Sequence, residues 1–210
     1  MKKILIALVL GIWSASANAS LIPVLGGQAV YDTDLDITWL ADANVAAGSA
    51  FDDGVSTTDG AMTWVNANAW AASLTVGGLT GWRLPSALNQ NGSGPCDPFN
   101  CTDSEMGHLF YNELGGTLGN SILTSSDPDL ALFSNVQFPY WSDTESASDP
   151  TNGAWFFQFM NGVQSTGSKE TQFFAWAVHD GDVSVVPIPT AVWLFGSALG
   201  LLGWMRGKKA

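Results

Sequence analysis

Basic residues are scarce in this 210-residue chain, which has seven lysines and arginines against nineteen aspartates and glutamates. Five of the seven lie close to a chain end. The segment between Ser20 and Pro187 therefore keeps only two cations, Arg83 and Lys169, against all nineteen carboxylates, and its formal charge is −17. A surface of this sign repels phosphate backbones, which excludes nucleic acid as a partner.

Cysteine and histidine are also scarce. The two cysteines, Cys96 and Cys101, enclose a short loop rich in glycine and proline, and such a pair in an exported protein is predicted to form a disulfide. The two histidines, His108 and His179, are accompanied by no G-x-S-x-G, no H-E-x-x-H and no phosphate-binding glycine loop. These absences favour a protein that is not an enzyme, although residue counts alone leave a Ser-His-Asp triad open.

Long uncharged apolar runs occur only near the two ends of the chain. Residues 4–13 follow Lys2 and Lys3 and precede a small-residue A-x-A site that ends at Ala19. This pattern is typical of a secretory signal peptide over residues 1–19, cleaved by signal peptidase between Ala19 and Ser20. The alternative, a permanent anchor, is disfavoured because the run is too short to span a bilayer.

The second run, residues 188–205, is followed by Arg206, Lys208 and Lys209. As a helix at ~1.5 Å per residue it would be about 27 Å long, close to the thickness of the hydrocarbon core. The trailing cations should then stay in the cytoplasm. We therefore expect a single transmembrane helix that holds the protein in the inner membrane before processing.

The segment from Val186 to Lys209, VPIPTAVWLFGSALGLLGWMRGKK, resembles the VPLPA type of PEP-CTERM sorting domain, with Ile188 where the commonest form has Glu. Exosortases, membrane peptidases of Gram-negative bacteria, process such domains. The resemblance implies cleavage near Pro187 and Pro189 and delivery to the cell surface or medium, often with exopolysaccharide. The chain then divides into a signal peptide (residues 1–19), an ectodomain (20–186) and a sorting segment (187–210).

Within the ectodomain, hydrophobic periodicity predicts an α+β domain with two helices packed on a twisted antiparallel sheet. Asp59 or Thr58 is positioned to cap the first helix, and Asn161-Gly162 is a strong hairpin turn. The last predicted strand is apolar on both faces, as expected for a central strand. The expected elements are strands over residues 28–31 and 37–40, a helix over 61–74, a second helix that begins after the capping-box sequence at 102–105 and ends at Gly115-Gly116, and strands over 140–144, 154–160 and 173–178.

The ectodomain also resembles the Lcl-type C-terminal domain family of bacterial extracellular proteins. The most specific matches are GWRLP at residues 81–85 and Tyr140-Trp141-Ser142, and weaker ones are YDTDLDITWL at 31–40 and EMGHLF at 105–110. This resemblance implies a C-type-lectin-like fold and a glycan-binding role. The family's binding of polyanionic glycans is not expected here, because two cations among nineteen carboxylates would not attract a sulfated polymer.

Two groups of residues are candidates for binding. Asp32, Asp34 and Asp36 alternate at period two, so an extended segment would place three carboxylates together for calcium; a solvated acidic turn is the favoured alternative. Tyr140 and Trp141 adjoin a polar loop, where their rings would either stack on a neutral sugar or close the core beneath the loop.

Arg83, in the GWRLP motif, has two interpretations. In the functional interpretation, it contacts an anionic or sugar ligand. In the structural interpretation, which is favoured, it pairs with a carboxylate, stacks on Trp82 and fixes the extended segment to the core. The overall expectation is an exported, non-catalytic domain associated with exopolysaccharide or biofilm matrix. The alternatives are an acidic adhesive protein without a ligand pocket and, less favoured, an enzyme that uses a free thiol.

Overall fold

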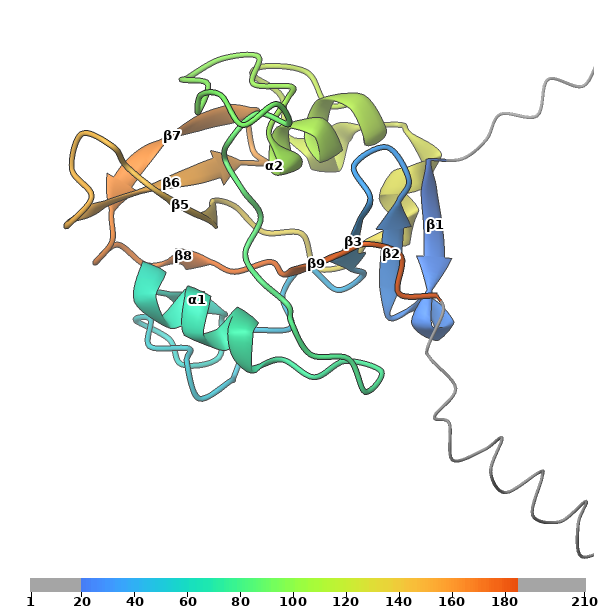
Figure 1. Ribbon diagram of the computed structural model, residues 1–210, viewed down its shortest axis with the longest axis horizontal. Coiled ribbons are helices and arrows are strands. Elements are labelled where there is room, and N and C mark those ends of the chain that lie inside the picture. Colours follow the sequence, from blue (N-terminus) through green and yellow to red (C-terminus); the bar gives the residue numbers. More distant parts are fainter. Residues whose placement is uncertain (1–19, 185–210) are drawn as a thin grey trace, which may run out of the picture.

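The computed structural model describes residues 20–184 as an α+β domain with short helices around two curled sheets (Figure 1). The predicted signal peptide, the predicted sorting motif at Val186, Pro187 and Pro189, and the predicted membrane helix lie outside the described residues. Among residues 20–184, no helix is long and apolar enough to cross a bilayer.

The first sheet contains four antiparallel strands in the order β1-β2-β3-β9. Trp39 in β3 pairs with Val30 on one side and with Val178 on the other. All four residues of β3 are buried, as expected for an inner strand made of β-branched and apolar residues. The strands are β1 Leu21–Val24, β2 Ala29–Asp32, β3 Ile37–Leu40 and β9 Val178–Asp180.

The second sheet has five strands in the order β4-β8-β5-β6-β7, and all its pairs are antiparallel except β5 with β8. The predicted hairpin is confirmed: β6 and β7 are joined by a turn in which Gly162 has φ +75°, a conformation that favours glycine. The strands are β4 Ala61–Met62, β5 Tyr140–Glu145, β6 Gly153–Gln158, β7 Val163–Ser168 and β8 Phe173–Phe174.

The prediction of one central strand over residues 173–178 is wrong. The segment is divided between the two sheets: β8 pairs in the second sheet, β9 pairs in the first, and residues 175–177 cross between them with no exposed surface (Figure 1). Trp176, in this crossing, donates from Nε1 to the Leu40 carbonyl at 2.8 Å and lies 5.2 Å from the Trp39 ring. The segment is apolar on both faces because it lies in the core between two sheets.

Helix α1, Trp64–Ser73, is shorter than predicted because residues 61 and 62 pair with β8 instead. Its predicted cap is also wrong. The N-cap is Thr63, whose side chain makes no capping bond; the Asp53 carboxylate accepts from the Thr63 amide. Helix α1 contacts the second sheet through Trp64, which donates from Nε1 to the Ser142 carbonyl.

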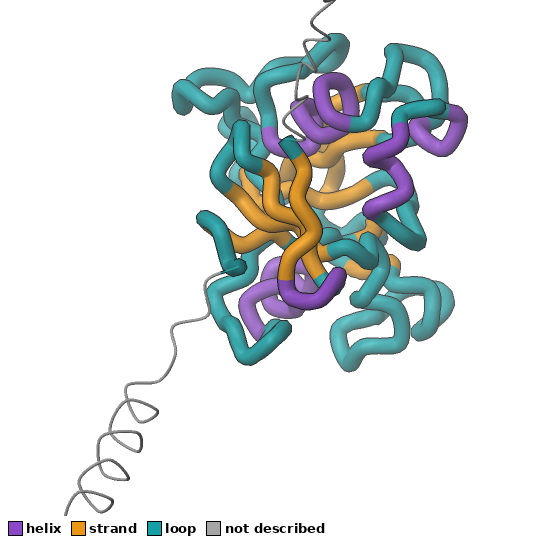
Figure 2. Tube along the Cα trace, turned by 90° about the vertical axis from the view of Figure 1, so that its right-hand side faces the viewer, coloured by secondary structure: helices purple, strands orange, loops and turns teal. Residues whose placement is uncertain are grey.

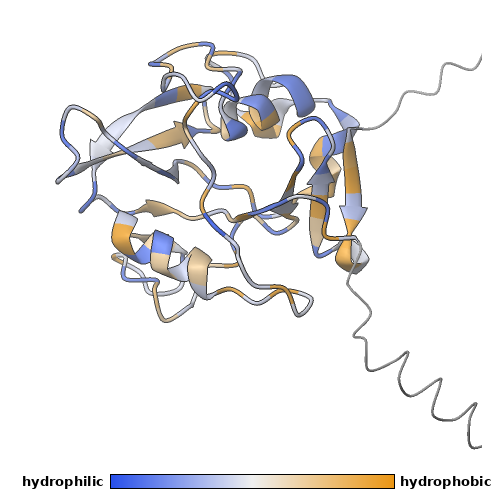
Figure 3. Ribbon diagram, in the orientation of Figure 1, coloured by the Kyte–Doolittle hydropathy of each residue, from blue (hydrophilic) through white to orange (hydrophobic). Residues whose placement is uncertain are grey.

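The second helical segment starts at Glu105, within the predicted capping-box sequence rather than after it, and Ser104 caps it by accepting from the Gly107 amide. Only its first turn, α2 Glu105–His108, is α-helical; the next, η2 Leu109–Glu113, has the wider π geometry. Short 3₁₀ turns complete the helical elements around the sheets (Figure 2): η1 Leu25–Gly27, η3 Ile122–Thr124 and η4 Pro128–Leu132. In Figure 3 the helical ribbons carry both hydrophobic and hydrophilic residues.

The predicted disulfide between Cys96 and Cys101 is confirmed. The loop it closes is also fixed to β7, because Gln164 donates from Nε2 to the Cys96 carbonyl and from its amide to the Pro98 carbonyl. The loop is therefore held both by the disulfide and by its hydrogen bonds to Gln164.

Replacing both cysteines by serine is expected to lower the free energy of unfolding by about 2 kcal/mol, the chain-entropy value for so short a loop. The protein should still fold, because the Gln164 bonds remain. Urea unfolding of the variant and of the reduced wild type should give the same midpoint. An unfolded variant would show that the loop depends on its disulfide.

Candidate metal centre and polar groove

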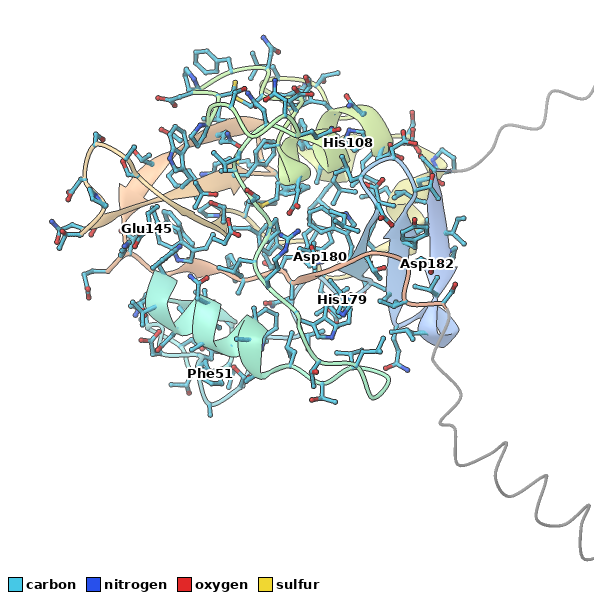
Figure 4. The ribbon with its side chains drawn as sticks, viewed as in Figure 1. Phe51, His108, Glu145, His179, Asp180 and Asp182 are labelled. Atoms are coloured by element: carbon cyan, nitrogen blue, oxygen red, sulfur yellow. A yellow bond between two sulfur atoms is a disulfide. The ribbon has the colours of Figure 1, made fainter. Side chains whose placement is uncertain are left out.

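Three ionisable side chains meet where the first sheet contacts the second helical segment. Asp32 is the last residue of β2, His108 the last of α2 and Glu113 the last of η2. One donor atom from each lies within 4.8 Å of the others, and all three residues are buried. In Figure 4, His108 lies on α2 on the side of the molecule where β2 turns into β3. We call Asp32, His108 and Glu113 the buried triad.

The π turn explains why residues five apart in sequence face one another. In an α-helix of 3.6 residues per turn, side chains at positions 108 and 113 would point about 140° apart. The wider η2 turn instead brings His108 Nε2 to 3.0 Å from Glu113 Oε1. π turns inside helices are frequent at functional sites.

Two further side chains contact the buried triad. The Asn112 amide lies 2.9 Å from His108 Nδ1, so both ring nitrogens have polar partners. The Ser20 hydroxyl donates to Glu113 Oε2. Ser20 is thereby held against the second helical segment, directly before β1.

The Asp32 carboxylate is only half satisfied. Its Oδ1 accepts from the amides of Asp34 and Leu35, at 3.0 and 3.1 Å, and its Oδ2 is buried without a hydrogen-bond partner. Burial raises the pKa of the Asp32 carboxyl, while the Leu35 amide and the positive charge of His108 act in the opposite direction. A buried carboxylate oxygen without a partner is costly.

The structure corrects the predicted calcium triplet. The backbone turns after Asp32, so the extended geometry on which the prediction depended is absent, and Asp36 has φ +53°. Asp32 points inward to the buried triad, whereas Asp36 accepts from the Tyr31 hydroxyl at 2.8 Å. Among residues 20–184, the buried triad is the only group of three such side chains that converge, and Asp34 and Asp36 are not part of it.

The structure also corrects the proposed sugar contact of Tyr140 and Trp141. Both side chains are fully buried, so neither ring offers a face to a ligand. The Tyr140 hydroxyl accepts from the Gln137 amide at 2.6 Å, and Trp141 donates from Nε1 to the Met62 carbonyl. These rings close the core, as the alternative interpretation held.

All five N–H donors of Arg83 are used inside the protein. Nη1 and Nη2 bind the two oxygens of Glu105 at 2.9 and 2.7 Å, Nε and Nη2 bind Asp180 Oδ1, and Nη1 also donates to the Leu84 carbonyl. Burial lowers the pKa of Arg83, but its bonds to Glu105 and Asp180 outweigh burial and raise the pKa. No donor is left for a ligand, which agrees with the structural interpretation. The Trp82 ring, on which Arg83 was expected to stack, packs edge-on against His179.

A polar groove of about 490 Å³ lies beyond the end of η2. Hydroxyl, amide and backbone groups dominate its lining, and Asp127 is its only ionisable side chain. No sequence motif indicates this groove, because its residues lie mainly in loops. The lining residues are Gly115, Gly116, Thr117, Asn120, Ser121, Thr124, Ser125, Ser126, Asp127 and Pro128.

No protein-family model and no curated protein sequence matches this chain at a significant level.

Proposed function

We propose that this chain is an exported, non-catalytic domain that associates with neutral polysaccharide of the extracellular matrix. The polar groove carries this proposal, because neutral sugars are recognised by hydroxyl and amide groups and the groove offers these within a domain of formal charge −17. A polyanion is an unsuitable ligand. The only two cations of residues 20–184 are paired with carboxylates, Arg83 with Glu105 and Lys169 with Glu145.

Export and sorting are part of the proposal and rest on the sequence. Signal peptidase would release the domain at Ser20, and β1 begins at the next residue. An exosortase-type peptidase would then cleave near Pro187 and Pro189 and leave the domain at the cell surface or in the medium. The disulfide between Cys96 and Cys101 is consistent with an oxidising compartment.

We further propose that the domain has the C-type-lectin-like fold of the Lcl-type family. Short helices around curled, mainly antiparallel sheets agree with such a fold. The GWRLP segment supports it as well, because Arg83 binds both Glu105 and Asp180 and thereby joins α2 to β9.

The arrangement of nucleophiles and bases favours a non-catalytic role. In residues 20–184, His108 contacts Glu113 and Asn112, and His179 contacts the backbone carbonyls of Thr80 and Asp180, so neither imidazole is paired with a hydroxyl. Both cysteines of the chain are in the disulfide, which leaves no free thiol for the alternative of a thiol-dependent enzyme.

Binding of the producing bacterium's neutral matrix polysaccharide should be saturable in titration calorimetry. Thr117 and Asn120 are exposed in the groove, and changing them together to valine and leucine should weaken binding about tenfold or more, the value of one or two lost hydrogen bonds. Thr151→Val, at an exposed threonine outside the groove, is the matched control. If no polysaccharide binds saturably, the adhesive protein without a ligand pocket becomes the better hypothesis.

A further inference from the structure

The buried triad has unbalanced charge. With His108 protonated and both carboxylates ionised, its net charge is −1 in a site where the His108 and Glu113 side chains are only 8% and 5% exposed. With a neutral imidazole the charge is −2. Both cations of residues 20–184 are engaged elsewhere, so no lysine or arginine supplies the missing charge. A buried charge without a counter-charge is strongly unfavourable.

The second observation is the unpartnered Asp32 Oδ2. This oxygen is buried and has no hydrogen-bond partner, on a side chain that also belongs to the buried triad. Protonation would remove the charge of this carboxylate but would supply no hydrogen-bond donor to the oxygen. A bound cation would satisfy the oxygen and balance the charge together.

The donor set suits a zinc-class ion. One imidazole nitrogen and two carboxylate oxygens are typical ligands of Zn²⁺, whereas calcium sites use oxygen donors alone. Zinc bonds of ~2.0–2.2 Å place neighbouring tetrahedral donors roughly 3.3 Å apart. The 3.0 Å between His108 Nε2 and Glu113 Oε1 requires only a small adjustment to reach that value.

The surrounding groups agree with this use of His108. A metal on Nε2 requires the proton on Nδ1 and an acceptor for that proton. Asn112 lies 2.9 Å from Nδ1, and turning its amide over presents Oδ1 as that acceptor. The Ser20 hydroxyl donates to Glu113 Oε2 and helps to orient that carboxylate.

We propose that Asp32, His108 and Glu113 bind one divalent ion of the zinc class, which fastens the end of β2 to the second helical segment. A neutral imidazole, two carboxylates and Zn²⁺ sum to zero charge. The site is structural, because its donors are buried and it lacks an open face for a substrate. This inference goes beyond the proposed polysaccharide binding and does not depend on it.

The test uses the protein as isolated from its cells, stripped with a chelator and titrated with Zn²⁺ and with Co²⁺ as a spectroscopic probe. We expect one ion per chain, a higher melting temperature with Zn²⁺, and at least 100-fold weaker binding in His108→Gln. His179→Gln is the matched control, because that imidazole lies outside the buried triad and its hydrogen-bond partners are backbone carbonyls. Equal affinity in the two variants, or no ion bound by the wild type, would overturn the proposal.

A second variant covers the case in which His108→Gln does not fold. Asn112→Leu keeps all three ligands and removes the group at Nδ1, so affinity for Zn²⁺ should fall by about tenfold or more. The residue is exposed, so the variant is expected to fold. Unchanged zinc affinity in a folded Asn112→Leu protein would contradict the assignment of Nε2 as the ligand.

Discussion

Trp176→Ala is expected to lower the free energy of unfolding by about 3–5 kcal/mol, the usual cost of truncating a fully buried aromatic residue. The side chain has no exposed surface, and its ring centre lies 5.2–5.6 Å from four other aromatic rings. The substitution also leaves the Leu40 carbonyl without the Trp176 Nε1 donor. These contacts join both sheets, so the loss should be cooperative. The four rings belong to Trp39, Phe133, Tyr140 and Phe159.

Urea unfolding followed by circular dichroism measures this loss. Trp176→Phe keeps a ring but removes the donor to Leu40, and it should lie between the wild type and Trp176→Ala. Phe99→Ala is the control, because Phe99 is 57% exposed and its truncation should change stability by less than about 0.5 kcal/mol. A loss below 1 kcal/mol in Trp176→Ala would show that the crossing segment is not central to the core.

The same residue shows where periodicity ceases to be informative. Residues 173–178 are apolar on both faces, which is typical of a central strand and equally of a segment that passes between two sheets. Only the pairing partners distinguish the two, and those partners, Met62 for Phe173 and Trp39 for Val178, are far away in sequence. The prediction that this segment is buried is correct for residues 175–178, whereas Phe173 and Phe174 are half-buried, and its division between two sheets was not predicted.

Features set by neighbouring residues were predictable. The Asn161-Gly162 turn, the start of the second helix to within a residue or so of Glu105 and the disulfide between Cys96 and Cys101 each depend on a few adjacent residues. The cap of α1 was missed because Asp53, ten residues away from Thr63, supplies the acceptor. Neighbouring residues were therefore enough to predict these local features, but not a contact such as that between Asp53 and Thr63, which depends on the path of a loop.

The buried triad was beyond such reasoning for two physical reasons. Asp32 is separated from His108 by most of the first half of the domain, and only the packing of β2 against α2 brings them together. His108 and Glu113 would face different directions in the α-helix that their sequence predicts, so the π turn is required to pair them. Of the predicted calcium ligands, Asp32 alone is in a position to bind metal.

The second large effect is expected at Arg83. Arg83→Met should lower the free energy of unfolding by about 2–3 kcal/mol, less than for a fully buried pair because the arginine side chain is 30% exposed. The Glu105 side chain is only 15% exposed and would lose its counter-charge while still accepting from the Ser86 amide. The backbone pairing of Arg83 with Val178 would remain and limit the damage.

A double-mutant cycle distinguishes loss of the charge pair from loss of packing. Glu105→Gln removes the stranded charge, so the double variant with Arg83→Met should be more stable than the sum of the single losses by about 1–2 kcal/mol. Asp180→Asn is the matched control: Asp180 binds the same guanidinium but is 77% exposed, so its loss should stay below about 1 kcal/mol. Additive losses in the cycle would mean that Arg83 acts through the packing of its side-chain stem. In that case, the pairing with Glu105 would not be what holds the GWRLP segment against the second helical segment.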